Sequence, residues 1–335
     1  MSEKKVNIII PSVEMSKELI ICLKGINNLK YKNFMVTIVL DVDNKKKIQK
    51  FEFEINKIIS GKINMSEKRN IGVKKFKSEY IAFIDSDAYP SINWLKNAIS
   101  YLSDPTIHAV GGPDLPFKKQ SYSEKITYLC HGSFFVSGQY KYRKFKKPKM
   151  ICKDFLKSCN CIMKRSLFLK HGGMNKKRYI GEDKDLFEKL RKKVKNFKAL
   201  FTPDVFIYHK DRPISKFLLQ RLSFGTDIFT PSSNFWYYSL LSYMPTFVLL
   251  STLLVLFFSK ILLIYKFYLC SIIIIIPNIM IYLELRNYIK KFKDIVITAL
   301  VINAVNILYA VGGLIALTGL KKLLEKKIYR FSRQK

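Results

Sequence analysis

Residues 79–87 read EYIAFIDSD, a short apolar run that ends in two carboxylates, Asp85 and Asp87. The run is typical of a strand buried on both faces. Inside a strand these like charges would share one face, so we expect them just beyond its carboxyl end. A turn there can place both around one divalent cation, and oxygen ligands suit Mg²⁺ or Mn²⁺. An acidic turn without a metal is the alternative.

Strands and helices alternate around this run. We predict further buried strands at residues 6–10, 36–40 and 109–110, and helices at 17–29, 69–76 and 94–102. Ser91 is expected to cap the last helix. The alternation predicts an α/β fold with a parallel, doubly wound sheet. Such sheets bind ligands at the carboxyl ends of their strands, where Asp41 and the Asp85/Asp87 pair would share one edge.

The composition limits the partners of the chain. Its 335 residues include 59 lysines and arginines against 25 acidic residues, a formal net charge of +34. This excess favours nucleic acid, acidic lipid or phosphorylated small molecules as partners, and a solvated lysine-rich surface is the alternative. The basic stretch at 141–149 allows the same two interpretations. Six scattered cysteines predict free thiols in a reducing compartment, and no signal peptide is expected before the first strand.

The composition changes near residue 237. Three long apolar stretches follow, at residues 238–258, 261–283 and 295–320. Each is long enough to cross a bilayer as a helix. Basic residues gather at 286–293 and at 321–335, and both groups favour the cytoplasmic side. Three full crossings cannot place both basic groups on the cytoplasmic side. We therefore predict attachment to a membrane but leave the number of crossings open, at two, three or four.

A second acidic cluster lies at residues 181–185, which read GEDKD. It precedes an amphipathic helix with an apolar stripe at Leu186, Phe187, Leu190 and Val194. Glu182 and Asp183 would lie in the first turn, where the helix dipole favours carboxylates for structural reasons alone. The functional interpretation is a general base held ionised near a hydroxyl group.

Seven segments occur in an order that resembles family 2 glycosyltransferases of the GT-A fold, over about residues 5–215. They are IIIP at 8–11, IVLD at 38–41, KRNIG at 68–72, IAFIDSD at 81–87, MKR at 163–165, GGM at 172–174 and GEDKDL at 181–186. The resemblance implies a Rossmann-like, mostly parallel sheet flanked by helices, here followed by a helical membrane-embedded tail. It also implies an inverting hexosyltransferase in cell envelope glycan biosynthesis, which the apolar tail would hold at the membrane. This enzyme would move a sugar from a nucleotide-sugar donor to a hydroxyl or phosphate of a lipid-linked or glycan acceptor.

The resemblance implies a role for each matching residue. Asp183 would be the catalytic base, Asp87 and His209 would bind Mn²⁺ or Mg²⁺, and the substrate contacts would be Asp41, Arg69, Asp85 and Glu182. Asp41 would contact the nucleotide base or ribose, Arg69 would lie near the nucleotide, and Asp85 would hold the ribose or the metal shell. The chain departs from the family pattern at Glu14, which replaces an asparagine, and at Val42, which replaces a second aspartate. The Q-x-x-R-W signature is absent, which disfavours a polymerising synthase.

The sequence predicts four segments: a GT-A domain at 1–212, an interfacial amphipathic linker at 213–236, transmembrane helices at 237–320 and a basic cytoplasmic tail at 321–335. We expect a multi-pass protein of the cell membrane with its catalytic domain facing the cytoplasm, a lipid-linked acceptor and no nucleic acid partner. One alternative is a sugar-phosphate nucleotidyltransferase, although residues 11–16 lack the expected glycines. The other is a membrane-tethered basic module that binds nucleic acid or anionic lipid without catalysis.

Overall fold

The computed structural model describes residues 4–44, 50–137, 149–151, 155–226, 251–252, 254, 257 and 263–318. The chain forms two compact units. The first unit comprises Met1–Phe117 and Arg143–Lys210, and the second comprises Lys118–Tyr142 and Asp211–Lys335. The four-segment division predicted from the sequence stays a prediction.

The main sheet of the first unit has the strand order β3-β2-β1-β4-β9-β6-β10-β8 in the described residues. The strands are β1 (Val6–Pro11), β2 (Phe34–Leu40), β3 (Glu54–Ile59), β4 (Tyr80–Ile84), β6 (Ala109–Gly111), β8 (Lys149–Ile151), β9 (Asn160–Lys164) and β10 (Ala199–Phe201). β3, β2, β1 and β4 run parallel, as do β6 and β10. β9 runs antiparallel to both β4 and β6, and β8 antiparallel to β10. The predicted mostly parallel α/β fold is confirmed, but the sequence did not predict the reversed strands.

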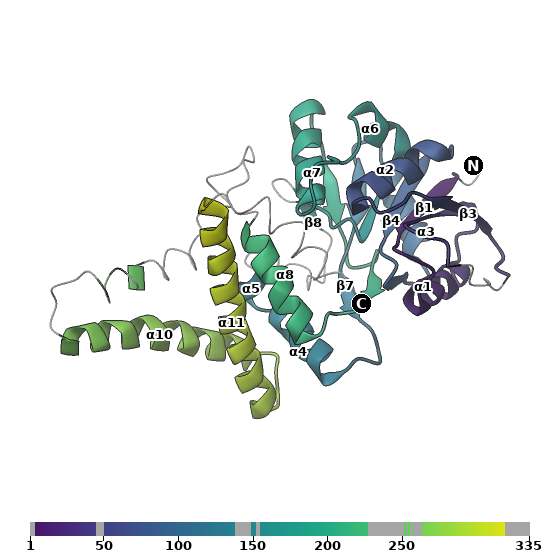
Figure 1. Ribbon diagram of the computed structural model, residues 1–335. Helices are drawn as coiled ribbons and strands as arrows, with labels where there is room; N and C mark the ends of the chain where they lie inside the picture. The colour runs from purple at the N-terminus through teal and green to yellow at the C-terminus, as the bar shows by residue number, and fades with distance from the viewer. Residues whose placement is uncertain are drawn as a thin grey trace. The chain divides into compact units, whose positions relative to one another are not determined.

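Helices cover both faces of this sheet (Figure 1). Because side chains alternate along a strand, Ile8 joins the core formed with α1 (Lys17–Asn27) and α3 (Trp94–Leu102). Ile9 points the other way, toward α2 (Met65–Lys75): a Cβ added at Gly72 would lie 2.8 Å from Ile9 Cγ2. Close packing of α2 therefore fixes the residues of its first turns at the carboxyl edge of β1 and β2.

The start of α3 differs from the prediction. The helix begins at Trp94, as expected, but its N-cap is Asn93, which makes no side-chain capping bond. Ser91 contributes its backbone instead: its carbonyl accepts from the Trp94 N–H (3.0 Å), and its N–H donates to the Phe206 carbonyl (3.2 Å). The predicted Ser91 side-chain cap is wrong because Ser91 directly follows strand β5 (Ala88–Pro90) and lies three residues before Trp94, so Asn93 occupies the cap position.

That strand belongs to a small second sheet, in the order β5-β11-β7. Its strands are β5 (Ala88–Pro90), β7 (Asp114–Pro116) and β11 (Ile207–His209). β11 runs antiparallel to β5, and His209 is paired with Ala88. Because β5 starts directly after Asp87, this pairing brings a histidine distant in sequence to the end of β4.

The second unit is helical where it is described. It contains α4 (Tyr122–His131), α5 (Phe134–Ser137), α8 (Ile214–Thr226), α10 (Leu263–Leu285) and α11 (Phe292–Leu317). Their shared apolar core includes Ile126 and Phe217. Asp294 of α11 accepts from the Tyr122 hydroxyl (2.8 Å) and pairs with Lys125 (2.6 Å). Residues 118–137 are thus joined to helices more than a hundred residues later.

The membrane predictions are tested only in part. Within the described residues, α11 is the one helix long and apolar enough to cross a membrane. α8 and α10 form where helices were expected. Most of the stretch at 238–258, most of the basic stretch at 141–149 and all of the tail at 321–335 lie outside the described residues. The described cysteines Cys22, Cys130, Cys159 and Cys161 are free thiols, as predicted, and all four are buried. Cys152 lies outside the described residues.

Helices α8 and α11 approach closely at two glycines. A Cβ on Gly225 would lie 2.9 Å from the Gly312 Cα and still closer to the Tyr309 carbonyl oxygen. We therefore expect Gly225→Ala to destabilise the helical unit by about 1–3 kcal/mol, the usual effect of overpacking. Thermal unfolding in detergent measures this effect. Leu300→Ala, at an exposed position of α11, is the control and is expected to change stability by less than about 0.5 kcal/mol. Equal unfolding temperatures for the two variants would contradict the packing argument.

Candidate active site

Three potential metal ligands meet at the carboxyl end of β4. The five residues of β4 are buried, and the chain then turns so that the Ala88 N–H bonds to the Asp85 carbonyl (3.1 Å). The Lys210 N–H bonds to the Asp87 carbonyl (3.0 Å), which holds β11 against this turn. His209 Nε2 then lies 3.5 Å from Asp87 Oδ1 and 3.9 Å from Asp85 Oδ2.

The chemistry of this group suits a divalent cation. Each residue offers one ligand atom, and the three atoms lie within 4.8 Å of one another. The side chains are 17–27% exposed, so solvent and ligands can reach them. Burial lowers the pKa of His209, but the Asp87 and Asp85 carboxylates raise it by more, and the net shift is upward. Such an arrangement attracts positive charge, whether a proton or a metal ion.

Arg69 joins this group to the second acidic cluster. Its guanidinium, on α2, lies 2.7 Å from Asp85 Oδ1 and 3.2 Å from Glu182 Oε1. The Arg69 and Glu182 side chains are almost fully buried. Helix α7 (Glu182–Lys193) begins at Glu182, after Gly181 in the left-handed region (φ 71°) that favours glycine. The acids at the end of β4 and at the start of α7, about 100 residues apart in sequence, therefore converge on one guanidinium.

Asp183 is held by backbone groups at the same place. Its Oδ2 accepts from the Ser158 N–H (3.2 Å) and its Oδ1 from the Lys184 N–H (3.0 Å). Ser158 precedes Asn160, which pairs with Ile84 at the end of β4. Burial, followed by the neighbouring Glu182 charge, raises the pKa of Asp183 to about 6. This carboxylate is ionised at neutral pH, yet it is basic enough to accept a proton.

Part of the chain matches a known protein family. Residues 7–172 match the family described as Glycosyl transferase family 2. The chain contains a domain of this glycosyltransferase family. No curated protein matches the chain significantly.

The solved structure of a mannosyltransferase shows the same fold as this glycosyltransferase, and a second structure is less similar. The mannosyltransferase PcManGT from Pyrobaculum calidifontis, solved with GDP-Man and Mn²⁺, has a TM-score of 0.59 at 15% identity, over 94% of this chain and 88% of that one. S. aureus TarS 1–349 has a TM-score of 0.46 at 12% identity, over 94% of this chain and 92% of that one. The GT-A fold expected from the resemblance is confirmed, and the chain is an enzyme of the glycosyltransferase class.

Asp41 lies at the end of β2 on the same edge of the sheet. Its Oδ1 is 2.5 Å from the ammonium of Lys68, a fully buried residue of α2. Lys68 also donates to the Ser12 carbonyl in the loop after β1. Sequence reasoning missed this lysine in the glycosyltransferase, because a lysine in a polar helix suggests a solvated face rather than a buried ion pair.

The buried contacts of two further polar side chains, Lys157 and Asn160, were also not predicted from the sequence. Lys157, next to the Asp183 anchor Ser158, pairs with Asp114 of β7. Asn160 is buried, and it accepts from the Trp94 indole (2.8 Å) while donating to the Val205 carbonyl (2.7 Å). Asn160 therefore links β9 to α3 and to the loop before β11. Only its place directly before an apolar run could have suggested a buried polar residue.

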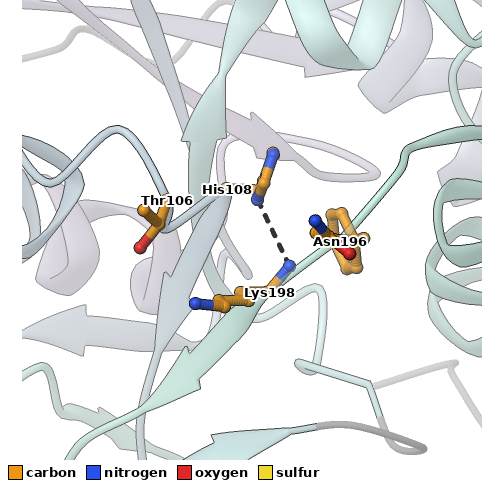
Figure 2. A pocket seen from close by; sticks show the side chains of 5 residues that line it. Thr106, His108, Asn196 and Lys198 are labelled. Atoms are coloured by element: carbon orange, nitrogen blue, oxygen red, sulfur yellow. Dashed lines mark hydrogen bonds between the residues drawn. The ribbon is translucent and has the colours of Figure 1, made fainter.

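One cavity of the first unit lies away from these residues. It has a volume of about 510 Å³ and is lined by Thr106, His108, Asn196, Phe197 and Lys198 (Figure 2). The Lys198 N–H donates to His108 Nδ1 (3.2 Å). His108 and Lys198 precede β6 and β10, so the cavity lies at the amino ends of these strands, whereas the metal group lies at the carboxyl end of β4. The candidate active site is therefore identified by its acidic and histidine side chains and not by this cavity.

Replacement of Arg69 tests how strongly the acids depend on it. Arg69→Met would leave Asp85 and the buried Glu182 without their shared cation, and removal of one partner from a buried ion pair costs about 3–5 kcal/mol. We expect a loss of unfolding free energy of this size, measured by denaturant or thermal unfolding. Arg165→Met is the matched control, because Arg165 donates to backbone carbonyls of α2 and has no ion pair with a described residue, and it should cost about 1 kcal/mol. Equal costs for the two variants would show that the acids do not need Arg69.

Proposed function

We propose that the chain is a metal-dependent, inverting glycosyltransferase of the membrane. It would transfer a sugar from a nucleotide-sugar donor to a hydroxyl or phosphate group of a lipid-linked acceptor. The observation that carries this proposal is the junction through Arg69. It brings the Asp85, Asp87 and His209 group and the Asp183 carboxylate to one edge of the sheet.

Asp87 and His209 would hold Mn²⁺ or Mg²⁺, with Asp85 contributing to the metal shell or the ribose contact. A bound metal supplies neutralisation of the charge that develops on the leaving diphosphate. Carboxylates suit either ion, while an imidazole nitrogen is a better match for Mn²⁺. The Mn²⁺ and GDP-Man in the Pyrobaculum calidifontis mannosyltransferase are in keeping with this choice of ion and donor class.

Asp183 would act on the acceptor. Its carboxylate would accept the proton of the acceptor hydroxyl while the oxygen attacks the anomeric carbon. The leaving diphosphate is on the opposite side of that carbon, so the configuration inverts. The Ser158 and Lys184 N–H bonds fix the orientation of the base, and its raised pKa matches it to the task.

The second unit supports an acceptor at a membrane. The apolar side chains of Phe292, Leu300 and Ile307 on α11 are more than half exposed. Basic residues surround the start of this helix, at Lys290, Lys291 and Lys293. Exposed apolar surface beside lysines is typical of a helix that meets an anionic bilayer. We propose several crossings, a catalytic domain on the cytoplasmic side and a role in cell envelope glycan synthesis.

A panel of nucleotide sugars tests the proposed function. The full chain in detergent or vesicles is supplied with each donor, a polyprenyl phosphate or a soluble glycan, and Mn²⁺, Mg²⁺ or a chelator. We expect release of nucleoside diphosphate that requires the metal and increases with the lipid acceptor. Formation of a nucleotide sugar from a nucleoside triphosphate and a sugar phosphate would instead indicate a nucleotidyltransferase. Absence of turnover, with binding that weakens steeply in salt, would indicate a basic binding module.

A further inference from the structure

The pairing of Lys68 with Asp41 restricts what Asp41 can bind. Lys68 is fully buried, and its ammonium contacts both Asp41 Oδ1 and the Ser12 carbonyl. Asn64 caps α2 by accepting from the Glu67 N–H (2.8 Å), so Lys68 lies one turn into a fixed helix. A lysine buried to this extent is rare unless it is paired. Its contacts tie together the ends of β1, β2 and the start of α2.

The two oxygens of Asp41 are consequently not equivalent. Oδ1 is buried against Lys68, whereas the side chain as a whole is 13% exposed. Oδ2 is therefore the oxygen that a ligand can reach. The Asp41 N–H donates to the Val13 carbonyl (2.9 Å), which holds the backbone of Asp41 against the loop after β1, and the contact with Lys68 then keeps Oδ1 turned inward.

We propose that Lys68 makes Asp41 a one-oxygen acceptor and that the donor nucleotide consequently carries uracil rather than guanine. The inference rests on the proposed function, in which Asp41 contacts the nucleobase. Guanine offers two donors on one edge, N1–H and N2–H, and a carboxylate binds them best with both oxygens. Uracil offers the single donor N3–H, which one oxygen satisfies. Lys68 touches no ligand itself, so it is a positioning residue.

Nucleotide binding to the full chain in detergent tests the proposal. The probes are UDP, GDP, CDP and ADP, each with Mn²⁺, and the readout is the dissociation constant from calorimetry. We expect wild-type protein to bind UDP about 10-fold or more tightly than GDP, the discrimination expected from one mismatched bidentate contact. Lys68→Met is expected to weaken UDP binding about 10-fold and to bring the UDP and GDP constants together. The rate at saturating donor should change less than about threefold, because Lys68 does not act on the reacting atoms.

Lys189→Met is the matched control, because Lys189 is a half-buried lysine that donates to the Gly173 carbonyl elsewhere in the same unit. It should leave the UDP to GDP ratio unchanged. Wild-type binding of GDP, CDP or ADP as tight as that of UDP would overturn the inference, even if Lys68→Met does not fold. An unchanged ratio in a folded Lys68→Met protein would also overturn it. Absence of binding by all four nucleotides with Mn²⁺ would instead reject the proposed function.

Discussion

Asp183→Asn is expected to lower the rate of sugar transfer about 10²–10⁴-fold, the contribution of a positioned general base. Asparagine keeps the shape of the side chain, and its carbonyl oxygen can still accept one of the two backbone N–H bonds. It cannot take the proton of the acceptor hydroxyl. Donor binding should therefore stay within about threefold of wild type. Single-turnover transfer and nucleotide binding measure the two quantities separately.

The pH dependence gives an independent check on this assignment. Since the pKa of Asp183 is raised to about 6, its carboxyl is protonated below that pH and cannot act as a base. The wild-type kcat/KM should fall as the pH decreases through about 6, and the residual activity of Asp183→Asn should lack this acid limb. Asp185→Asn is the control, because Asp185 lies in the same helical turn but faces Arg178 (3.7 Å). Near-normal turnover in Asp183→Asn would reject Asp183 as the base.

Asp87→Ala is expected to abolish the metal-dependent part of donor binding and to reduce turnover about 10²-fold or more. The expected size follows from the several kcal/mol of charge stabilisation that a catalytic metal supplies. Removal of one carboxylate leaves Asp85 and His209 as two ligands, too few to hold Mn²⁺ or Mg²⁺ against water. The dissociation constant of the donor, with Mn²⁺ and with chelator, measures the effect.

The control for this variant is Asp204→Ala. Asp204 accepts from the Tyr101 hydroxyl (2.8 Å) and is not one of the three candidate ligands. Its removal should leave the response to Mn²⁺ unchanged. If wild-type donor affinity is the same with and without chelator, the metal assignment is wrong, whatever the variant does.

The sequence was informative where a pattern is long enough to repeat. β1, β2 and β4 are mainly apolar runs, with Asn7 and Thr37 as polar exceptions, and their burial follows from that composition. Asp85 and Asp87 were predictable because two acids directly after such a run have no place inside the sheet. The topology then brings the ends of β2 and β4 to one edge, with β1 between them.

Other features lack a local signal. The strands of the second sheet are three residues long, too short for periodicity to predict them, so the route that carries His209 to Asp87 could not be predicted. The buried pair of Lys68 and Asp41 depends on a contact between two loops and a helix. Arg69 was expected near the nucleotide, and its two buried ion pairs with Asp85 and Glu182 became visible only in the fold. Its contact with the donor stays a prediction.

The tie between Lys125 and Asp294 has a practical consequence for anyone who wishes to separate the two halves of this enzyme. A truncated polypeptide that stops at Lys210 would still contain α4 but would lack α8, α10 and α11, against which α4 packs. Ile126 and Cys130 would face water, and such newly bared apolar surface promotes aggregation. A soluble fragment must therefore lack two segments, the part of the chain after Lys210 and the internal segment Lys118–Tyr142.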